Sequence, residues 1–290
     1  MLHSLENDIL RITVDDHGAE LRSITEKLDG TEYLWNGDPT WWKYTSPVLF
    51  PIVGKLVDGK YRADGREYAL PGHGFARTSE FTCTRKSSDE LIFVLEWGQE
   101  TTDVYPYHFR LEIAYILRLN KVKVMWTVKN LDTEPMYFSI GAHPALRCPI
   151  VPGEEFADCF LKFDLAEKSD RIMLTPEGVL SHERRPVLDG KELPLNYDLF
   201  QEDALIFDDL KSDEITICSR KSEKSITLKA KGFPFWGIWT KPGAPFLCLE
   251  PWHGHADFED FTGDISEKDG IRKLRGRESF NAGYSFLIND

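Results

Sequence analysis

The chain lacks what marks several large classes of protein. Its 35 Lys and Arg residues against 48 Asp and Glu give a formal net charge of −13, so no basic excess is available to neutralise the phosphates of nucleic acid or an anionic membrane. No apolar run approaches the ~20 residues that a membrane span needs. The five cysteines are odd in number and form no CxxC pair, which argues against a disulfide framework or a zinc knuckle. We therefore expect neither a nucleic-acid partner nor a membrane partner.

The start of the chain also lacks a targeting signal. Residues 1–6, MLHSLE, contain neither the basic segment nor the apolar segment of a signal peptide. We expect a cytoplasmic protein. Interface strands and core strands share one pattern, so the sequence leaves a monomer and a homodimer equally open.

Helical periodicity is scarce as well. The best candidate is one or two turns near residues 266–273, where Ser266 would cap the helix and Asp269 would close a capping box. Two stretches, 148–158 and 181–198, have the composition of long connections. The sequence has no long linker, repeat or low-complexity tract, which predicts a single domain over residues 1–290.

Short apolar runs dominate instead. Apolar residues alternate over 111–119 and again over 122–128, which predicts a hairpin with one buried face. The continuous apolar run 91–95 predicts a strand covered on both sides. Further strands are expected over residues 10–14, 213–218, 225–229, 235–240, 246–250 and 279–288. Many strands without a βαβ pattern indicate an all-β fold, an antiparallel sandwich or barrel.

Four segments, 47–55, 71–77, 141–144 and 247–255, break the strand-and-turn pattern. In the second, glycines flank His73, so the backbone can turn tightly or approach a ligand, and Arg77 lies on the same loop. A structural histidine bonded to backbone is an equal alternative. In the third, His143 follows a strand and precedes proline, and its imidazole titrates near neutrality, which suits proton transfer. A structural role for His143 also stays open.

Glu250 is the most informative residue of the fourth segment. It ends the apolar strand 246–249 and precedes Pro251. A carboxylate at the end of a buried strand must be paired, hydrogen-bonded or functional, and desolvation would raise its pKa towards that of a useful base. A structural ion pair is the alternative.

A metal site is the competing interpretation of the same segment. His253, His255 and Glu259 match the spacing of the first metal motif of cupins. Leu247 and Ser266 stand where that motif has glycines, and no histidine follows His255 to supply a third imidazole. We therefore expect no metal ligands here.

Other aromatic and histidine residues are weaker candidates. His108 is expected to be structural, and three more histidines are expected at the surface: His3, His17 and His182. Of Trp236 and Trp239, one that faced a cleft could stack on the C–H face of a sugar ring.

Together these segments resemble the aldose 1-epimerase (galactose mutarotase) superfamily, most closely its LacX-like branch. The likeness covers nearly the whole chain and rests on five motifs in order: VLFPIVG at 48–54, HGFAR at 73–77, GAHP at 141–144, IWTKP at 238–242 and CLEPW at 248–252. The resemblance implies a large antiparallel β-sandwich, the galactose mutarotase-like supersandwich, with the active site in a cleft on one sheet.

The resemblance also implies roles for individual residues. His143 matches the general acid that protonates the ring oxygen, Glu250 matches the general base at the anomeric hydroxyl, and His73 matches a histidine that binds substrate hydroxyls. Arg77 matches a residue that can face the phosphate in sugar-phosphate relatives. Two further positions, Lys55 where relatives tend to carry arginine and Asp203 in DALIF at 203–207, match sugar-binding residues. With Trp239 they complete the predicted substrate-binding set.

The function so implied is that of an isomerase, an aldose 1-epimerase that interconverts the anomers of an aldohexose without metal or organic cofactor. Two alternatives remain open at this point. One is a non-catalytic carbohydrate-binding or sugar-sensing protein of the same fold, and the other is the cupin-like metalloenzyme. The sequence does not identify the sugar or decide whether it is phosphorylated.

Overall fold

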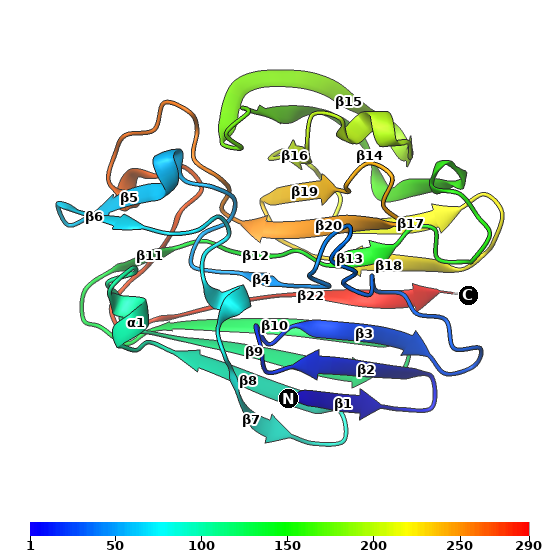
Figure 1. Ribbon diagram of the computed structural model, residues 1–290, viewed down its shortest axis with the longest axis horizontal. Helices are drawn as coiled ribbons and strands as arrows, with labels where there is room; N and C mark the ends of the chain where they lie inside the picture. Colours follow the sequence, from blue (N-terminus) through cyan, green and yellow to red (C-terminus); the bar gives the residue numbers. More distant parts are fainter. Residues whose placement is uncertain (290) are drawn as a thin grey trace.

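The alternation of apolar and polar residues produces strands along most of the chain in the computed structural model, which describes residues 1–289 (Figure 1). The strands are β1 Leu2–Glu6, β2 Leu10–Asp15, β3 Leu21–Glu26, β4 Val48–Leu49, β5 Lys60–Ala63, β6 Arg66–Ala69, β7 Thr82–Lys86, β8 Glu90–Glu96, β9 Phe109–Arg118, β10 Lys121–Asn130, β11 Met136–Phe138, β12 Ile140–Ala142, β13 Ala145–Arg147, β14 Cys159–Leu174, β15 Leu180–Pro194, β16 Leu205–Phe207, β17 Glu214–Ser219, β18 Ser225–Lys229, β19 Phe235–Trp239, β20 Phe246–His253, β21 Arg272–Leu274 and β22 Ser279–Asn289. Helical structure consists of α1 Gln99–Thr102 and five 3-10 turns: η1 Val57–Gly59, η2 Ala76–Thr78, η3 Phe156–Asp158, η4 Tyr197–Phe200 and η5 Ile265–Glu267.

One large sheet organises the molecule. Its strands follow the order β4-β12-β20-β19-β16-β14-β17-β18-β22-β10-β9-β8-β7, with β13 added on β20 and β15 on β14. A second sheet, β1-β2-β3, lies across β8–β10 (Figure 1), where the Tyr115 hydroxyl donates to the Ala19 carbonyl at 2.7 Å. The pairings between named strands in residues 1–289 are antiparallel. The predicted all-β, antiparallel fold class is confirmed.

The predicted central hairpin is confirmed in detail. β9 and β10 pair in continuous register, with Val124 opposite Tyr115, and buried residues alternate with half-buried ones along both strands. The run 91–95 lies in β8 as expected, although Ile92 is only half-buried, so the strand is covered on both faces only over residues 93–95.

Three sequence-based expectations were wrong. Glu250 was expected to end its strand, but β20 continues past it to His253. Most of the stretch 181–198 is a strand, β15, which pairs with β14 through three register shifts. Its polar residues face solvent, so the alternation that marks a half-buried strand is missing from the sequence. The helix expected over 266–273 is reduced to η5, and its cap is Asp264, whose side chain accepts from the Ser266 N–H at 3.0 Å.

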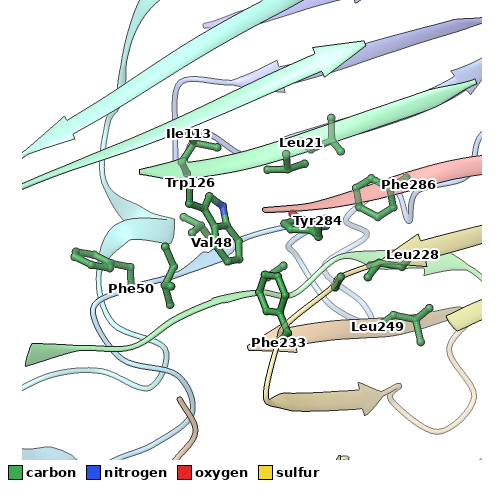
Figure 2. Close-up of a cluster of buried hydrophobic side chains, with 14 of the residues drawn as sticks. Leu21, Val48, Phe50, Ile113, Trp126, Leu228, Phe233, Leu249, Tyr284 and Phe286 are labelled. Carbon is green, nitrogen blue, oxygen red and sulfur yellow. The ribbon is translucent and has the colours of Figure 1, made fainter. Parts of the chain in front are cut away.

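The core explains why the strands hold together. Figure 2 shows Trp126 and Phe286 packing with Phe233, Leu249 and neighbours between the layers. The same apolar cluster contains residues from Leu5 to Ile288. Burying each such side chain stabilises the fold by about 1.5–3 kcal/mol relative to exposure. Within residues 1–289 no helix has the length and apolar character needed to cross a membrane. The single domain stays a prediction.

Candidate active site

A cavity of about 240 Å³ opens beside β20. Its lining includes the seven residues predicted for the site: Lys55, His73, Arg77, His143, Asp203, Trp239 and Glu250. These residues come from segments far apart in the sequence, and the fold places them around one cavity. Their chemical roles remain predictions.

His143 and Glu250 form the centre of this cavity. Glu250 lies in the middle of β20, opposite Gly237 of β19, and His143 follows β12, with its backbone N–H donating to the Pro47 carbonyl at 3.2 Å. The His143 Nε2 atom lies 3.3 Å from Glu250 Oε2. Both side chains are buried, and neither His143 Nδ1 nor Glu250 Oε2 has a hydrogen-bond partner among the described residues. Buried polar atoms without partners are costly, which marks this pair as a place for a ligand.

The electrostatics of the pair follow from its burial. Burial, and then the charge of Asp203, raise the pKa of Glu250 well above its usual value. Burial, and then electrostatic interactions with His73 and Arg77, lower the pKa of His143 well below its usual value. Desolvation disfavours the charged form of each group. In the unliganded site burial therefore favours a neutral carboxyl beside a neutral imidazole.

His73 is held as a neutral hydrogen-bond donor. The Gly54 N–H donates to His73 Nδ1 at 3.2 Å, so in the neutral ring the proton resides on Nε2. Burial, and then Arg77 and Lys55, lower the pKa of His73 to about 3. The backbone here is tightly fitted, because a Cβ on the neighbouring Gly74 would lie 2.2 Å from the Phe50 carbonyl oxygen. The turn therefore fixes the ring edge-on to His143, with 5.5 Å between centroids.

The two cations of the cavity are already engaged with backbone. The Arg77 guanidinium donates to the Gly72 carbonyl at 2.8 Å and lies 5.0 Å from the centre of the Tyr44 ring. The Lys55 ammonium donates to the Glu177 carbonyl at 2.7 Å. Both side chains therefore help to hold the cavity walls in place and also give the cavity positive charge.

Asp203 reaches the cavity from a strained turn. Its φ of 69° is in the left-handed region, and its carboxylate accepts from the next residue's N–H, that of Ala204, at 2.7 Å. One carboxylate oxygen is thus used to hold the turn, and the side chain adds a negative charge that faces Glu250.

Two tryptophans form the aromatic side of the cavity. Trp239 meets His143 edge-on at 5.8 Å between centroids, and Trp42 stacks on His143 at 4.6 Å with an angle of 28° between the rings. Trp42 was missed by the sequence analysis. The available signal was an adjacent tryptophan pair, Trp41-Trp42, in a stretch without strand alternation. The buried Glu20 holds this loop, since its carboxylate accepts from the Ser46 N–H at 3.0 Å.

The residues of the cupin-like alternative do not converge. His253 packs between the rings of Phe233 and Phe280, whereas His255 bonds to the Ala256 carbonyl at 2.7 Å and contacts Asp269 at 3.2 Å. Glu259 is exposed. Within residues 1–289, these three do not form a group with metal-ligand spacing.

Comparison with known proteins decides the family. The aldose 1-epimerase family profile matches residues 1–268. The chain belongs to the aldose 1-epimerase family. It is 35% identical to the chromosomal protein LacX of Lactococcus lactis subsp. lactis over 298 aligned positions, which cover 99% of each chain.

Solved structures agree with this family assignment. A galactose mutarotase related enzyme from Lactobacillus acidophilus superposes with a TM-score of 0.95 at 32% identity, over 100% of this chain and 98% of that one. A galactose mutarotase-like protein from Lactobacillus casei gives 0.93 at 29% identity, over 100% of both chains. The predicted LacX-like branch and mutarotase-like fold are confirmed.

Proposed function

We propose that this family member is a mutarotase, an isomerase that interconverts the α and β anomers of an aldohexose. The observation that carries the proposal is the buried His143–Glu250 pair, 3.3 Å apart in a cavity with aromatic and hydrogen-bonding walls. Mutarotation needs one proton delivered to the ring oxygen and another removed from the anomeric hydroxyl, and this pair has one donor and one acceptor within reach of a single hemiacetal.

The proton balance of the reaction suits the pair. His143, as imidazolium, gives its proton to the ring oxygen while the Glu250 carboxylate takes the anomeric hydroxyl proton. The bond from the anomeric carbon to the ring oxygen breaks and the aldehyde carbonyl forms. Rotation about the adjacent C–C bond presents the other face of the aldehyde, and the two transfers then run in reverse. The pair carries one proton throughout, first on His143 and then on Glu250, so no net charge enters or leaves the buried site.

The burial of the pair decides which of the two groups holds the proton when no sugar is bound. The empty site favours the proton on Glu250, which is the distribution of the open-chain stage. A bound sugar offers an acceptor to His143 and a hydroxyl donor to Glu250, and these bonds stabilise the charged distribution that starts ring opening. Each positioned group is typically worth ~100- to 10,000-fold in rate.

The walls favour a free aldohexose as substrate, with a hexose phosphate as the alternative. Trp239 and Trp42 offer apolar faces to a sugar ring, and His73 donates one hydrogen bond. Arg77 and Lys55 already donate to backbone carbonyls, so a phosphate would have to compete for them.

Anomerisation of freshly dissolved α-glucose and α-galactose, followed by polarimetry or saturation-transfer NMR, tests the proposal. We expect the wild type to accelerate equilibration and Glu250→Gln to be at least ~100-fold slower, because the amide cannot accept the anomeric proton. Glu259→Gln is the matched control, since Glu259 is an exposed carboxylate outside this cavity. Binding of hexoses by calorimetry without acceleration, across free and phosphorylated hexoses, would replace the mutarotase with the sugar-binding alternative.

A further inference from the structure

A third reactive side chain lies beside the catalytic pair. Cys248 precedes Glu250 by two residues on β20, and β13 pairs with this strand so that Ala145 faces Cys248, two residues after His143. The ligand atoms of Cys248, His143 and Glu250 all lie within 4.8 Å of one another. All three side chains are buried.

We propose that Cys248, His143 and Glu250 form a binding site for zinc, and that zinc is an inhibitor rather than a cofactor. A thiolate, an imidazole nitrogen and a carboxylate oxygen are the three donor types that Zn²⁺ takes in proteins. Three protein ligands leave a fourth, tetrahedral position, which the cavity can fill with water or a sugar oxygen.

The geometry needs little change to hold the ion. Ligand bonds of about 2.0–2.3 Å in a tetrahedron place donor atoms roughly 3.3–3.6 Å apart. The His143 and Glu250 atoms already have that separation, at 3.3 Å. The Cys248 Sγ atom lies within 4.8 Å of both, so it completes the set by moving towards them by on the order of 1 Å. Separate backbone contacts hold the three: Cys248 pairs with β13, Glu250 pairs with β19, and the His143 N–H donates to the Pro47 carbonyl at 3.2 Å.

Two further features of this cluster favour a cation. The Oε2 atom of Glu250, which faces His143 Nε2, is buried without a hydrogen-bond partner among residues 1–289. The charges also balance, since a thiolate, a carboxylate and a neutral imidazole cancel the two charges of Zn²⁺. Binding releases the thiol proton, and any proton on Glu250, to solvent. The buried site therefore gains no net charge on loading.

Zinc is expected to inhibit because it would bind the two residues proposed to transfer protons. This expectation of inhibition rests on the proposed function. A zinc ion bound to both His143 and Glu250 removes the acid and the base at once. The sugar would then have to displace the ion or bind above it. Mutarotation is expected to stop in stoichiometric zinc and to return when a chelator is added.

Metal binding is tested first without sugar, so the result does not depend on activity. We expect the full-length protein to bind one Zn²⁺ by calorimetry, and Co²⁺ in its place to give a near-ultraviolet thiolate-to-metal charge-transfer band. Cys248→Ala should lose the band and weaken zinc binding at least tenfold. Cys148→Ala is the matched control, because Cys148 is equally buried but outside the cluster. A wild type without the band, or a Cys248→Ala variant that binds zinc like the wild type, would overturn the site.

Inhibition is measured second, in the anomerisation assay. The zinc concentration for half inhibition should rise at least tenfold in Cys248→Ala and stay unchanged in Cys148→Ala. Equal inhibition of both variants would contradict the assignment. If the wild type shows the cobalt band but no mutarotation, the metal site stands and the proposed function fails.

Discussion

At the scale of single residues, His143 and Glu250 were recognised from the sequence in different ways. Glu250 could be singled out by its own position, because a carboxylate that directly follows an apolar run is costly to bury, although the structure places it in the middle of β20 and not at a strand end. His143 could not, because eight histidines share the same side-chain chemistry and only the GAHP motif of the family distinguished it. The structure adds their 3.3 Å separation, which no local pattern contains.

Two histidines, the half-buried His73 and the buried His253, make the stability of the fold depend on pH. Burial, with Arg77 and Lys55 next, lowers the pKa of His73 to about 3, and burial, with Arg272 next, lowers that of His253 to about 4. In the unfolded chain both titrate near about 6.5, so below that pH the unfolded state binds more protons. The stabilising contribution is complete above pH ~6.5 and is lost as the pH falls towards the folded pKa values. Each histidine should cost on the order of 2 kcal/mol at pH 5 relative to pH 7.

Urea unfolding at pH 7 and pH 5 measures this loss of stability. His253→Gln, outside the cavity, should lose less stability than the wild type between the two pH values, by on the order of 2 kcal/mol. His182→Gln is the control, because His182 is an exposed residue paired with Asp260 at 3.0 Å. An identical loss in wild type and His253→Gln would rule out the assigned titration.

At the scale of elements, the β14–β15 hairpin is a part of the fold that the sequence pattern did not predict. Its turn helps to enclose the candidate active site. In Figure 1 this hairpin rises above β16 and β19. Its turn closes through the Gly178 N–H, which donates to the Thr175 carbonyl at 2.9 Å, and Gly178 itself lines the cavity. The ammonium of Lys55 holds the turn through Glu177. Lys55 is thus a positioning residue as well as a predicted sugar contact.

Lys55→Met should loosen this turn, because methionine keeps the apolar stem and loses the donor. A hydrogen bond from a charged group is worth about 1.5–3 kcal/mol, and less for an exposed lysine such as Lys55, so we expect KM for the hexose to rise about 3- to 10-fold with a smaller change in kcat. Lys191→Met is the matched control: Lys191 donates to the Asp164 carbonyl at 2.9 Å elsewhere on the same hairpin. An unchanged KM in Lys55→Met would show that the turn holds its place without the lysine.

At the scale of the whole molecule, one apolar cluster connects the sheets. Phe286 on β22 is fully buried in it, and β22 pairs with β10 on one side and β18 on the other (Figure 2). A core shared in this way couples the elements energetically. This coupling is the physical basis of the single-domain prediction.

Phe286→Ala tests that prediction. Removing the ring leaves a cavity and should lower the free energy of unfolding by about 3–5 kcal/mol. Far-ultraviolet circular dichroism and tryptophan fluorescence should shift together, in the wild type and in the variant, because one cooperative unit has one transition. Phe286→Leu should cost less. Two separated transitions, only one of which moves, would indicate two domains.

The sequence by itself determined the features that local patterns or ordered motifs encode. The alternation at 109–130 defines the β9–β10 hairpin, because side chains of a strand point alternately to its two faces, and the ordered motifs define the family. The fold class and the chemically important residue types follow from these patterns.

Only the tertiary structure decided how those residues meet. It paired the polar strand β15 with β14, brought the overlooked Trp42 onto His143, and engaged Lys55 with the β14–β15 turn. It also placed Cys248 beside the His143–Glu250 pair. Distances, burial and therefore pKa values arise from contacts between segments remote in the chain, and no local pattern of residues specifies them. His143 and Glu250 can be predicted as acid and base from the sequence and its family resemblance, but their separation and burial are properties of the folded cavity.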